Sequence, residues 1–356
     1  MKVLTVVGAR PQFIKAAPVS RLLREQNEEF LLHTGQHYDD AMSDLFFRQL
    51  RIPAPDRNLE VGSGPHGAQT GAMLAGIEQS ALEFRPDWLL VYGDTNSTLA
   101  GALVGAKLHI PVAHVEAGLR SHDRRMPEEI NRVVTDHVST VLLCPTATAV
   151  ANLAREGIVD GVRNVGDVMF DAFRLNLDIA RRESRVLSSL GLTPRGFHLL
   201  TVHRAENTDQ PERLRAILGG VGASGCPTVF PVHPRTRAVL DAGSMTAPQN
   251  LRLVDPVGYL DMLVLEENAE AIVTDSGGVQ KEAYFAGRPC VTLRDATEWT
   301  ETVEVGWNRL VGTDPHAIAD AMKSFRPEGD RPELFGDGHA AEHVVQALSG
   351  VEPSRP

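Results

Sequence analysis

Residues 88–116, WLLVYGDTNSTLAGALVGAKLHIPVAHVE, decide the fold class. Trp88–Tyr92 and Val112–Val115 are short apolar runs, and the stretch between them, Thr98–Leu108, has the composition of a helix. Strands that are apolar on both faces and are joined by a helix are typical of parallel sheets. The segment therefore predicts a strand–helix–strand unit of an α/β protein.

The same alternation of strands and helices extends in both directions along the chain. Further strands are predicted at Val3–Val7, Phe30–Leu32, Thr140–Leu143, Leu199–Val202, Thr228–Val232, Leu251–Val254, Ala271–Thr274 and Cys290–Leu293. Further helices are predicted at Ile14–Glu25, Ala68–Phe84, Glu128–Val138, Thr148–Glu156, Phe170–Leu187, Gln210–Gly219, Tyr259–Asn268, Gly278–Ala286 and Pro315–Ser324. We therefore expect two doubly wound α/β domains that face each other across a cleft.

The boundary between the two domains is expected near Val165–Val168, where a strand-like run meets Gly166 and Asp167 and a charged helix follows. This places residues 1–167 in the first domain and 168–339 in the second. A length of 356 residues fits two domains.

Composition excludes several classes of function. The chain has 35 basic and 46 acidic side chains, a net charge of −11, which argues against broad binding to nucleic acid or to anionic membranes. No run approaches the ~18 apolar residues of a membrane helix, and the N-terminus does not resemble a signal peptide. The three cysteines stand far apart, without a disulfide or metal-binding spacing. We therefore expect a cytoplasmic enzyme.

Charged side chains follow three strands of the first half. Arg10 and Lys15 lie at the entrance of the first helix, Asp94 comes just after the strand Trp88–Tyr92, and Glu116 closes the strand Val112–Val115. Glu128 lies in the first turn of the helix that follows. Parallel strands place such residues at one edge of the sheet, where ligands bind. Cations beside a helix N-terminus favour an anion, and crowded carboxylates suit acid–base chemistry. Helix capping and solvated surface charge are the structural explanations for the same residues.

The second half carries the sharpest local signal, TDSGGVQKE at 274–282. A strand leads into Ser276, Gly277 and Gly278 at the start of a helix, where backbone amides can approach a phosphate and a serine adds a hydroxyl. Glu282 lies inside the first turns, within reach of a ribose hydroxyl. His203 follows another strand, beside Arg204, and is a second candidate. A plain glycine-rich turn is the structural explanation for this segment.

Several competing motifs fail. Gly62–Gly67 matches the pattern GxGxxG, but the strand before it is short and a proline lies inside, so we predict a loop. The chain has no Walker A sequence, no GxSxG elbow and no HExxH. His114 and Glu116 form half of a metal site at most, with no evident partner cluster.

Nine short strings, in this order, resemble the non-hydrolysing UDP-N-acetylglucosamine 2-epimerase family: GARPQFIKAAPV, TGQH, YGDTNST, HVEAGLRS, MPEEINR, TVHRAEN, FPVHPRTR, TDSGGVQKEA and RDATEW. Each string alone is weak, but their ordered combination from the first strand to about Gly312 is specific. The resemblance implies a GT-B-like architecture of two Rossmann-like domains, with a last helix at about 340–352 that returns to the first. It also implies a homodimer that uses no cofactor and no metal.

The resemblance further implies a mechanism of anti elimination and re-addition of UDP through a 2-acetamidoglucal. It assigns Asp94, Glu116, Glu128 and His203 to catalysis. It assigns binding of the UDP-sugar to Arg10, Lys15, Ser276, Gly277, Gly278 and Glu282. Gln36 and His37 match a segment where a second UDP-N-acetylglucosamine acts as an allosteric activator in some bacterial members.

Three segments differ from the best-known members of that family. Trp299 replaces an active-site arginine, Ala205 replaces another arginine, and Gln12-Phe13 replaces the commoner Glu-Ala. These variants resemble the branch that acts on modified sugars such as UDP-2,3-diacetamido-2,3-dideoxyglucuronate. The sequence also leaves open two further enzyme classes, a hydrolysing 2-epimerase and a GT-B glycosyltransferase.

Overall fold

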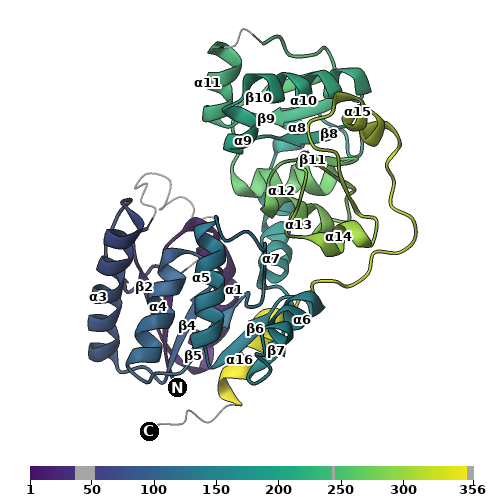
Figure 1. Cartoon of the computed structure of the whole chain (residues 1–356). Helices are drawn as coiled ribbons and strands as arrows, with labels where there is room; N and C mark the ends of the chain where they lie inside the picture. The colour runs from purple at the N-terminus through teal and green to yellow at the C-terminus, as the bar shows by residue number, and fades with distance from the viewer. Residues whose placement is uncertain (37–52, 243–244, 351–356) are drawn as a thin grey trace. The chain divides into compact units, whose positions relative to one another are not determined.

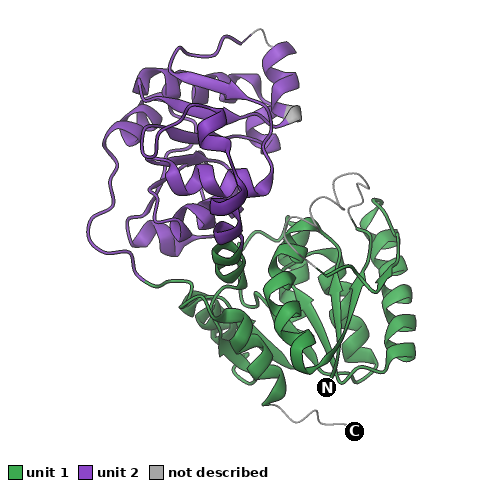
Figure 2. Ribbon diagram, turned by 180° about the vertical axis from the view of Figure 1, so that it is seen from behind, with its two compact units in different colours: residues 1–175, 333–356 green, residues 176–332 purple. Residues whose placement is uncertain are grey.

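A computed structural model describes residues 1–36, 53–242 and 245–350 of the chain. The chain forms two compact units, which Figure 2 distinguishes by colour. Unit 1 comprises Met1–Leu175 together with Glu333–Pro356, and unit 2 comprises Asn176–Pro332. Each unit is built around one parallel sheet.

The sheet of unit 1 has seven strands in the order β3-β2-β1-β4-β5-β6-β7, all parallel. The strands are β1 (Lys2–Val7), β2 (Glu28–His33), β3 (Arg57–Asn58), β4 (Trp88–Tyr92), β5 (Val112–Val115), β6 (Val141–Cys144) and β7 (Val162–Asn164). The helices of unit 1 are α1 (Arg10–Gln26), α3 (His66–Phe84), α4 (Asn96–Lys107), α5 (Pro127–Val138), α6 (Ala147–Arg155) and α16 (Ala340–Ser349). The boundary between the units falls within α7 (Val168–Glu183).

The sheet of unit 2 has six parallel strands in the order β10-β9-β8-β11-β12-β13. The strands are β8 (His198–Thr201), β9 (Thr228–Pro231), β10 (Leu251–Val254), β11 (Ile272–Thr274), β12 (Cys290–Thr292) and β13 (Asn308–Leu310). The helices are α8 (Val186–Ser189), α9 (Ala205–Thr208), α10 (Pro211–Ser224), α11 (Pro234–Ala242), α12 (Tyr259–Asn268), α13 (Gly277–Phe285), α14 (Thr300–Glu304) and α15 (Pro315–Ser324).

These two sheets confirm the predicted α/β class with two doubly wound domains. The strands predicted at Trp88–Tyr92, Val112–Val115 and Leu251–Val254 have the predicted bounds. The two-residue strand β3 was not predicted, because Arg57 and Asn58 are polar and too few to form a pattern. The predicted loop at Gly62–Gly67 is confirmed only in its first four residues, because α3 begins at His66 and includes Gly67.

One predicted helix is wrong. Instead of a single helix at Phe170–Leu187, α7 ends at Glu183 and α8 starts at Val186. The break lies at Ser184, whose hydroxyl donates to Asp261 (2.5 Å) and accepts from the amide of Val186 (3.2 Å). A serine side chain that bonds nearby backbone competes with the helical hydrogen bonds, which is why the helix stops here.

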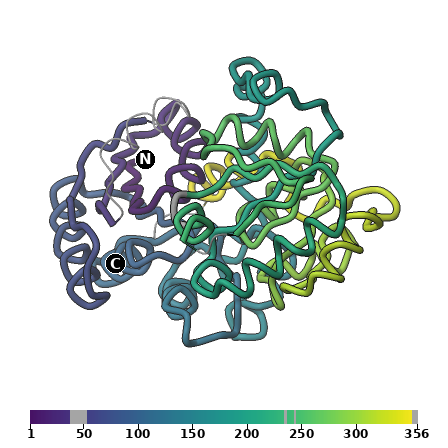
Figure 3. The backbone as a smooth tube through the Cα atoms, turned by 90° about the horizontal axis from the view of Figure 1, so that it is seen from above, coloured from purple at the N-terminus to yellow at the C-terminus, as the bar shows by residue number. Residues whose placement is uncertain are grey.

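The core of unit 1 explains why these segments become strands. Leu4, Val6, Leu89 and Val91 are fully buried in the two central strands β1 and β4, with helices on the faces of the sheet. The last helix also belongs to this unit, because α16 packs against α1 with Val344 and Leu348 buried. Figures 1 and 3 show the yellow α16 beside the purple α1.

Both sheets have a point where the strand order reverses. In unit 1 this switch point lies between β1 and β4, and in unit 2 it lies between β8 and β11. Crossover helices leave opposite faces of the sheet at such a point, so a crevice forms at the carboxyl ends of the two strands. The predicted site residues of each half follow these strands or their neighbours.

Candidate functional site

The turn after β1 is fixed by the buried side chain of Gln12. Its carbonyl oxygen accepts from the amides of Gly8 (2.8 Å) and Ala9 (3.0 Å), and its amide donates to the carbonyl of Tyr92 (2.7 Å). Gly8 is needed because a β-carbon there would lie 1.9 Å from the hydroxyl of Ser97. The ends of β1 and β4 are therefore locked together beside the switch point.

Arg10 and Lys15 lie where the sequence predicts, on the first two turns of α1. Arg10 is the first residue of the helix and is exposed. Lys15 forms an ion pair with Glu116, and both side chains are largely buried, at 13% and 7% exposure. The pair stands over Gly93, where a β-carbon would lie 3.3 Å from Glu116 Oε2 and 3.4 Å from Lys15 Nζ. A glycine at this position, with φ of +65°, leaves room for the pair.

Glu116 itself has a strained backbone. It follows the last residue of β5 and has φ of +74°, a left-handed conformation that a side chain with a β-carbon rarely adopts. Such conformations persist where the surrounding structure enforces them, and they are concentrated at functional sites. In this conformation the Glu116 carboxylate meets Lys15 at the edge of the sheet.

Asp94 is the second carboxylate of this edge. Its side chain is about one-third exposed and pairs with Arg132 of α5 at 2.5 Å. Burial raises the pKa of Asp94, and the nearby carboxylates of Glu116 and Glu128 act in the same direction, against the opposing charges of Arg132 and Lys15. A carboxyl with a raised pKa is suited to carry a proton.

Glu128 and its neighbour Glu129 differ in exposure and in their contacts. Glu128 is exposed on the first turn of α5 and lies close enough to affect the charge of Asp94. Glu129 is buried, and its carboxylate accepts from the amides of Ser121 and His122, both at 2.9 Å, and from Arg132. Glu129 therefore holds the 121–126 loop, while Glu128 is available to a ligand.

The structure thus brings together four of the predicted residues, Lys15, Asp94, Glu116 and Glu128, at one edge of the sheet of unit 1. Asn131 of α5 supports the cluster, because its side-chain amide donates to the carbonyl of Asp94 (2.9 Å). Three carboxylates with one lysine and one arginine form a mixed-charge group that can accept and return protons.

The site of unit 2 is organised by a buried aspartate. Asp275 follows β11, and its carboxylate accepts from the amides of His203 (3.1 Å) and Arg204 (3.1 Å) and from the side chain of Asn207 (3.0 Å). These bonds fix the turn after β8 beside the start of α13. His203 is exposed and lies at this switch point.

Ser276, Gly277 and Gly278 begin helix α13. The hydroxyl of Ser276 caps the helix by accepting from the amide of Val279 (3.4 Å). A β-carbon on Gly277 would lie 2.3 Å from Glu298, whereas one on Gly278 would meet nothing closer than 3.9 Å. The open face at Gly278 and the amides at the N-terminus of a helix are features that suit the binding of an anion.

Glu282 lies on the second turn of α13 beside a second buried carboxyl. It accepts from the hydroxyl of Tyr259 (3.3 Å), and Glu266 is its fully buried neighbour. Burial raises the pKa of both carboxyls, and their proximity disfavours two negative charges. Glu282 can therefore act as donor or acceptor toward a hydroxyl group.

Of the two predicted allosteric residues, Gln36 is described and His37 lies outside the described residues. The carbonyl oxygen of Gln36 accepts from the hydroxyl (2.7 Å) and the amide (3.2 Å) of Ser97, at the start of α4. Gln36 is thus attached to the switch point of unit 1.

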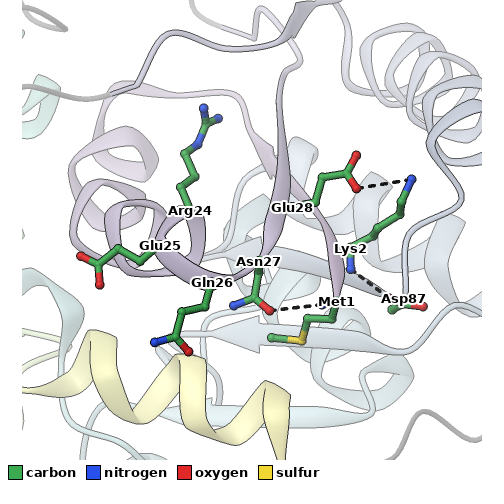
Figure 4. Close-up of a pocket in the computed structure, with 8 residues that line it drawn as sticks. All are labelled: Met1, Lys2, Arg24, Glu25, Gln26, Asn27, Glu28 and Asp87. Atoms are coloured by element: carbon green, nitrogen blue, oxygen red, sulfur yellow. Dashed lines mark hydrogen bonds and ion pairs between the residues drawn. The ribbon is translucent and has the colours of Figure 1, made fainter.

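A surface pocket lies at the opposite edge of the same sheet (Figure 4). It is lined by Met1, Lys2, Arg24, Glu25, Gln26, Asn27, Glu28 and Asp87, at the amino ends of β1, β2 and β4. Lys2 pairs with Glu28 (3.5 Å), and its backbone amide donates to Asp87 (2.8 Å). Ligands of such sheets bind at the carboxyl ends, so this pocket is separate from the candidate site.

Among the residues that the structure describes, no group of three or more histidine, cysteine or acidic side chains is placed to hold a metal ion. The helices in the same ranges are all too short or too polar to cross a bilayer.

Several supporting residues were not singled out from the sequence. They are Arg132 and Asp136 on α5, Asp275 after β11, and Glu266 on α12. Asp275 had a usable signal, because an acid directly after a buried strand matches the rule that predicted Asp94 and Glu116. Arg132 and Asp136 had no such signal, because only tertiary contact shows which face of α5 meets β4 and β5.

Two doubly wound units, each with polar groups at its switch point, define an α/β enzyme of the GT-B-like class. Residues 21–349 match the family model described as UDP-N-acetylglucosamine 2-epimerase. The chain therefore belongs to the UDP-N-acetylglucosamine 2-epimerase family, as its sequence motifs predicted.

Known relatives cover almost the whole chain. A UDP-N-acetylglucosamine 2-epimerase homolog of Methanococcus maripaludis is 52% identical, over 99% of this chain and 100% of its own. The UDP-2,3-diacetamido-2,3-dideoxy-D-glucuronate 2-epimerase of Pseudomonas aeruginosa is 48% identical, over 98% and 99%. The crystal structure of Methanocaldococcus jannaschii UDP-GlcNAc 2-epimerase in complex with UDP-GlcNAc and UDP is 45% identical, with a TM-score of 0.86 over 99% and 100%.

Proposed function

We propose that the enzyme reversibly inverts carbon 2 of a UDP-linked 2-acetamido sugar, converting UDP-N-acetylglucosamine to UDP-N-acetylmannosamine. The observation that carries the proposal is the group of Lys15, Asp94, Glu116 and Glu128 at the carboxyl edge of the first sheet. The relative from Methanocaldococcus jannaschii, solved with UDP-GlcNAc and UDP, supports the same substrate.

The reaction proceeds in two steps. In the first, a carboxylate removes the proton from carbon 2, the electron pair forms the double bond between carbons 1 and 2, and the β-phosphate oxygen leaves carbon 1 with its electrons. In the second, that oxygen attacks carbon 1 of the 2-acetamidoglucal while a proton is delivered to the opposite face of carbon 2. Each acid or base contributes roughly 10²–10⁴ in rate.

Unit 1 supplies the acid–base groups. Asp94, Glu116 and Glu128 differ in exposure and in their partners, so they can take different roles as acid and base in one reaction. Lys15 compensates the charge of Glu116 and contacts the sugar.

Unit 2 binds the nucleotide. The turn at Ser276, Gly277 and Gly278 accepts the diphosphate, and each favourable contact at a helix terminus contributes ~0.3–2 kcal/mol. Arg10 and His203 add charge-assisted hydrogen bonds to the departing UDP, and Glu282 binds the ribose. Several donors must act together, because one contact stabilises the leaving group too little.

A second candidate substrate is UDP-2,3-diacetamido-2,3-dideoxyglucuronate. The observation that favours it is the 48% identity to the Pseudomonas aeruginosa enzyme, together with Trp299. The Trp299 ring is buried and lies under the ammonium group of Lys281, 4.3 Å from the ring centre. This arrangement replaces the guanidinium that the better-known family members carry at the site.

The test is incubation of the purified enzyme with each UDP-sugar in deuterium oxide, followed by proton NMR. We expect epimerised UDP-sugar with deuterium at carbon 2, and the faster of the two substrates identifies the branch. Epimerised product without label would contradict the proposal. Free sugar and UDP would favour a hydrolysing 2-epimerase, and turnover only with an added acceptor would favour a glycosyltransferase.

We further propose that the enzyme is a cytoplasmic homodimer in which Gln36 and His37 bind an activating second nucleotide sugar. Light scattering of the purified protein tests the dimer, and cell fractionation tests the location. A sigmoidal dependence of rate on UDP-N-acetylglucosamine that is lost in Gln36→Ala tests the activation.

A further inference from the structure

His114 lies in β5, two residues before Glu116, and the proposed mechanism does not use it. Its side chain is completely buried, and both ring nitrogens have a partner at 2.7 Å. Nδ1 meets the carboxylate of Asp136 on α5, and Nε2 meets the backbone carbonyl of Gly93, directly before Asp94.

Both partners are hydrogen-bond acceptors. A backbone carbonyl can only accept. Asp136 accepts at its other oxygen from Arg120 (2.7 Å) and from the amide of Gly118 (3.1 Å), as an ionised carboxylate does. Burial alone would raise the pKa of Asp136, but its bonds to His114 and Arg120 outweigh this and lower it. A neutral imidazole would place a nitrogen lone pair against one of these acceptors at 2.7 Å, so both nitrogens must carry hydrogen.

We propose that His114 is a positioning residue that donates a hydrogen bond from each ring nitrogen, to the Gly93 carbonyl and to Asp136, and thereby holds Asp94 and Glu116 in place. The identity of these two carboxylates as acid–base groups rests on the proposed function. The protonation of His114 does not.

The surroundings compensate the buried charge. Arg120 adds a second cation, and it binds Glu156 at the end of α6 through two hydrogen bonds of 2.7 and 2.8 Å. The carboxylates of Asp136 and Glu156 balance the two cations. Cys144 on β6 lies close to Asp136 and Arg120, and burial raises the pKa of its thiol to about 12, so it is neutral. A buried ion pair is tolerated when its charges are balanced and hydrogen-bonded in this way.

The same group explains how the strain at Glu116 is maintained. His114 holds the chain before Glu116, and the Gly118 amide, bonded to Asp136, holds it afterwards. Because Asp136 belongs to α5, which also carries Glu128, one ionic group fixes all three carboxylates of the site relative to one another. Small displacements of such groups cost about 100-fold in rate.

Nitrogen-15 NMR of the histidine side chains in the full-length wild-type enzyme tests the protonation. Among the thirteen histidines, the one whose signals are missing from the spectrum of His114→Gln should carry a hydrogen on both ring nitrogens under the conditions of the activity assay. If those signals are those of a neutral ring, the proposal is wrong, whatever reaction the enzyme catalyses.

Kinetics test the positioning. In His114→Gln, we expect kcat to fall about 100-fold while the dissociation constant of UDP, measured by calorimetry, changes less than about twofold. His137→Gln on the exposed face of α5 is the matched control and should keep the wild-type kcat. A wild-type kcat in His114→Gln would refute the positioning role, whereas an inactive wild-type enzyme would refute the proposed function instead.

Discussion

The two carboxyl groups of Asp94 and Glu116 in the unit 1 site have different electrostatic surroundings. Asp94 is partly buried beside Arg132, while Glu116 is nearly fully buried beside Lys15. Two carboxyls with such different partners can hold a proton at different moments of one reaction. This division, rather than any one residue, is what acid–base chemistry at a weakly acidic carbon requires.

Replacing either carboxyl should separate catalysis from nucleotide binding. We expect Asp94→Asn and Glu116→Gln to lower kcat by roughly 10²–10⁴, because each removes an acid or base but keeps the shape. UDP should bind with wild-type affinity in calorimetry, since neither carboxyl is among its proposed contacts. The exposed residues Asp160 and Glu78 supply the controls Asp160→Asn and Glu78→Gln, which should retain full activity. Normal turnover in either site variant would refute the assignment.

His33 makes the fold of unit 1 sensitive to acid. Its side chain is buried against Phe13, with the ring centres 4.9 Å apart, and burial lowers its pKa from 6.5 to about 4. The unfolded chain therefore binds a proton at a pH where the folded chain does not. The stability contribution is present above about pH 6.5 and is lost as the pH falls toward about 4.

We expect thermal melts of the wild type to show this loss, and His33→Asn to show a shallower decline of Tm over the same pH range. His109→Asn, at an exposed left-handed position on a loop, is the control and should follow the wild type. Identical pH dependence in His33→Asn and the wild type would show that other groups cause the acid sensitivity.

At the scale of elements, the start of α13 offers a substitution that separates stability from binding. A methyl group on Gly278 would meet nothing in the protein closer than 3.9 Å but would stand where the proposed diphosphate binds. We expect Gly278→Ala to fold with wild-type Tm or slightly above and to bind UDP at least about tenfold more weakly, a loss of ~1.4 kcal/mol.

Gly219→Ala is the matched control for this substitution. Gly219 lies in α10, where a β-carbon would also meet nothing within 4 Å. Alanine favours a helix by ~0.8–1 kcal/mol over glycine, so this variant should gain stability and keep its affinity for UDP. Equal UDP affinity in the two variants would place the diphosphate elsewhere.

Most helices and strands were predictable from the sequence, and the wrong predictions are confined to short segments. Buried strands such as β4 and β5 follow from continuous apolar runs, and Gly277–Phe285 follows from the Ser-Gly-Gly start. The break between α7 and α8 was missed because it depends on the hydroxyl of Ser184 finding Asp261, 77 residues further along the chain. No local pattern contains that contact.

At the scale of the whole molecule, the chain leaves unit 1 after Leu175 and returns to it at Glu333. Its last helix, α16, then completes the core of the unit that its first helix began. The amide of Ala341 donates to the carboxylate of Asp171 on α7 (2.7 Å), which anchors the start of this helix. The C-terminal segment is therefore part of unit 1 in energetic terms.

Leu348→Ala tests whether α16 stabilises unit 1. Leu348 is 1% exposed, and removing such a side chain costs ~2–5 kcal/mol. We expect faster amide exchange in α1, β1 and β2, with exchange in α10 and α15 of unit 2 unchanged. Gln346→Ala, on the exposed face of the same helix, should leave exchange as in the wild type. Faster exchange confined to unit 2 would contradict this assignment.

The sequence by itself determined the α/β class, the two doubly wound sheets and the family. Apolar runs, glycine turns and ordered motifs are local features, so they can be recognised without a structure. Tertiary structure alone decided that Lys15 pairs with Glu116, that Arg132 reaches Asp94, and that His114 and Asp136 connect the turns that carry these carboxylates. Those contacts join residues far apart in the chain. Their side chains are also buried to an extent that only the folded chain defines, and no single segment of sequence encodes that burial.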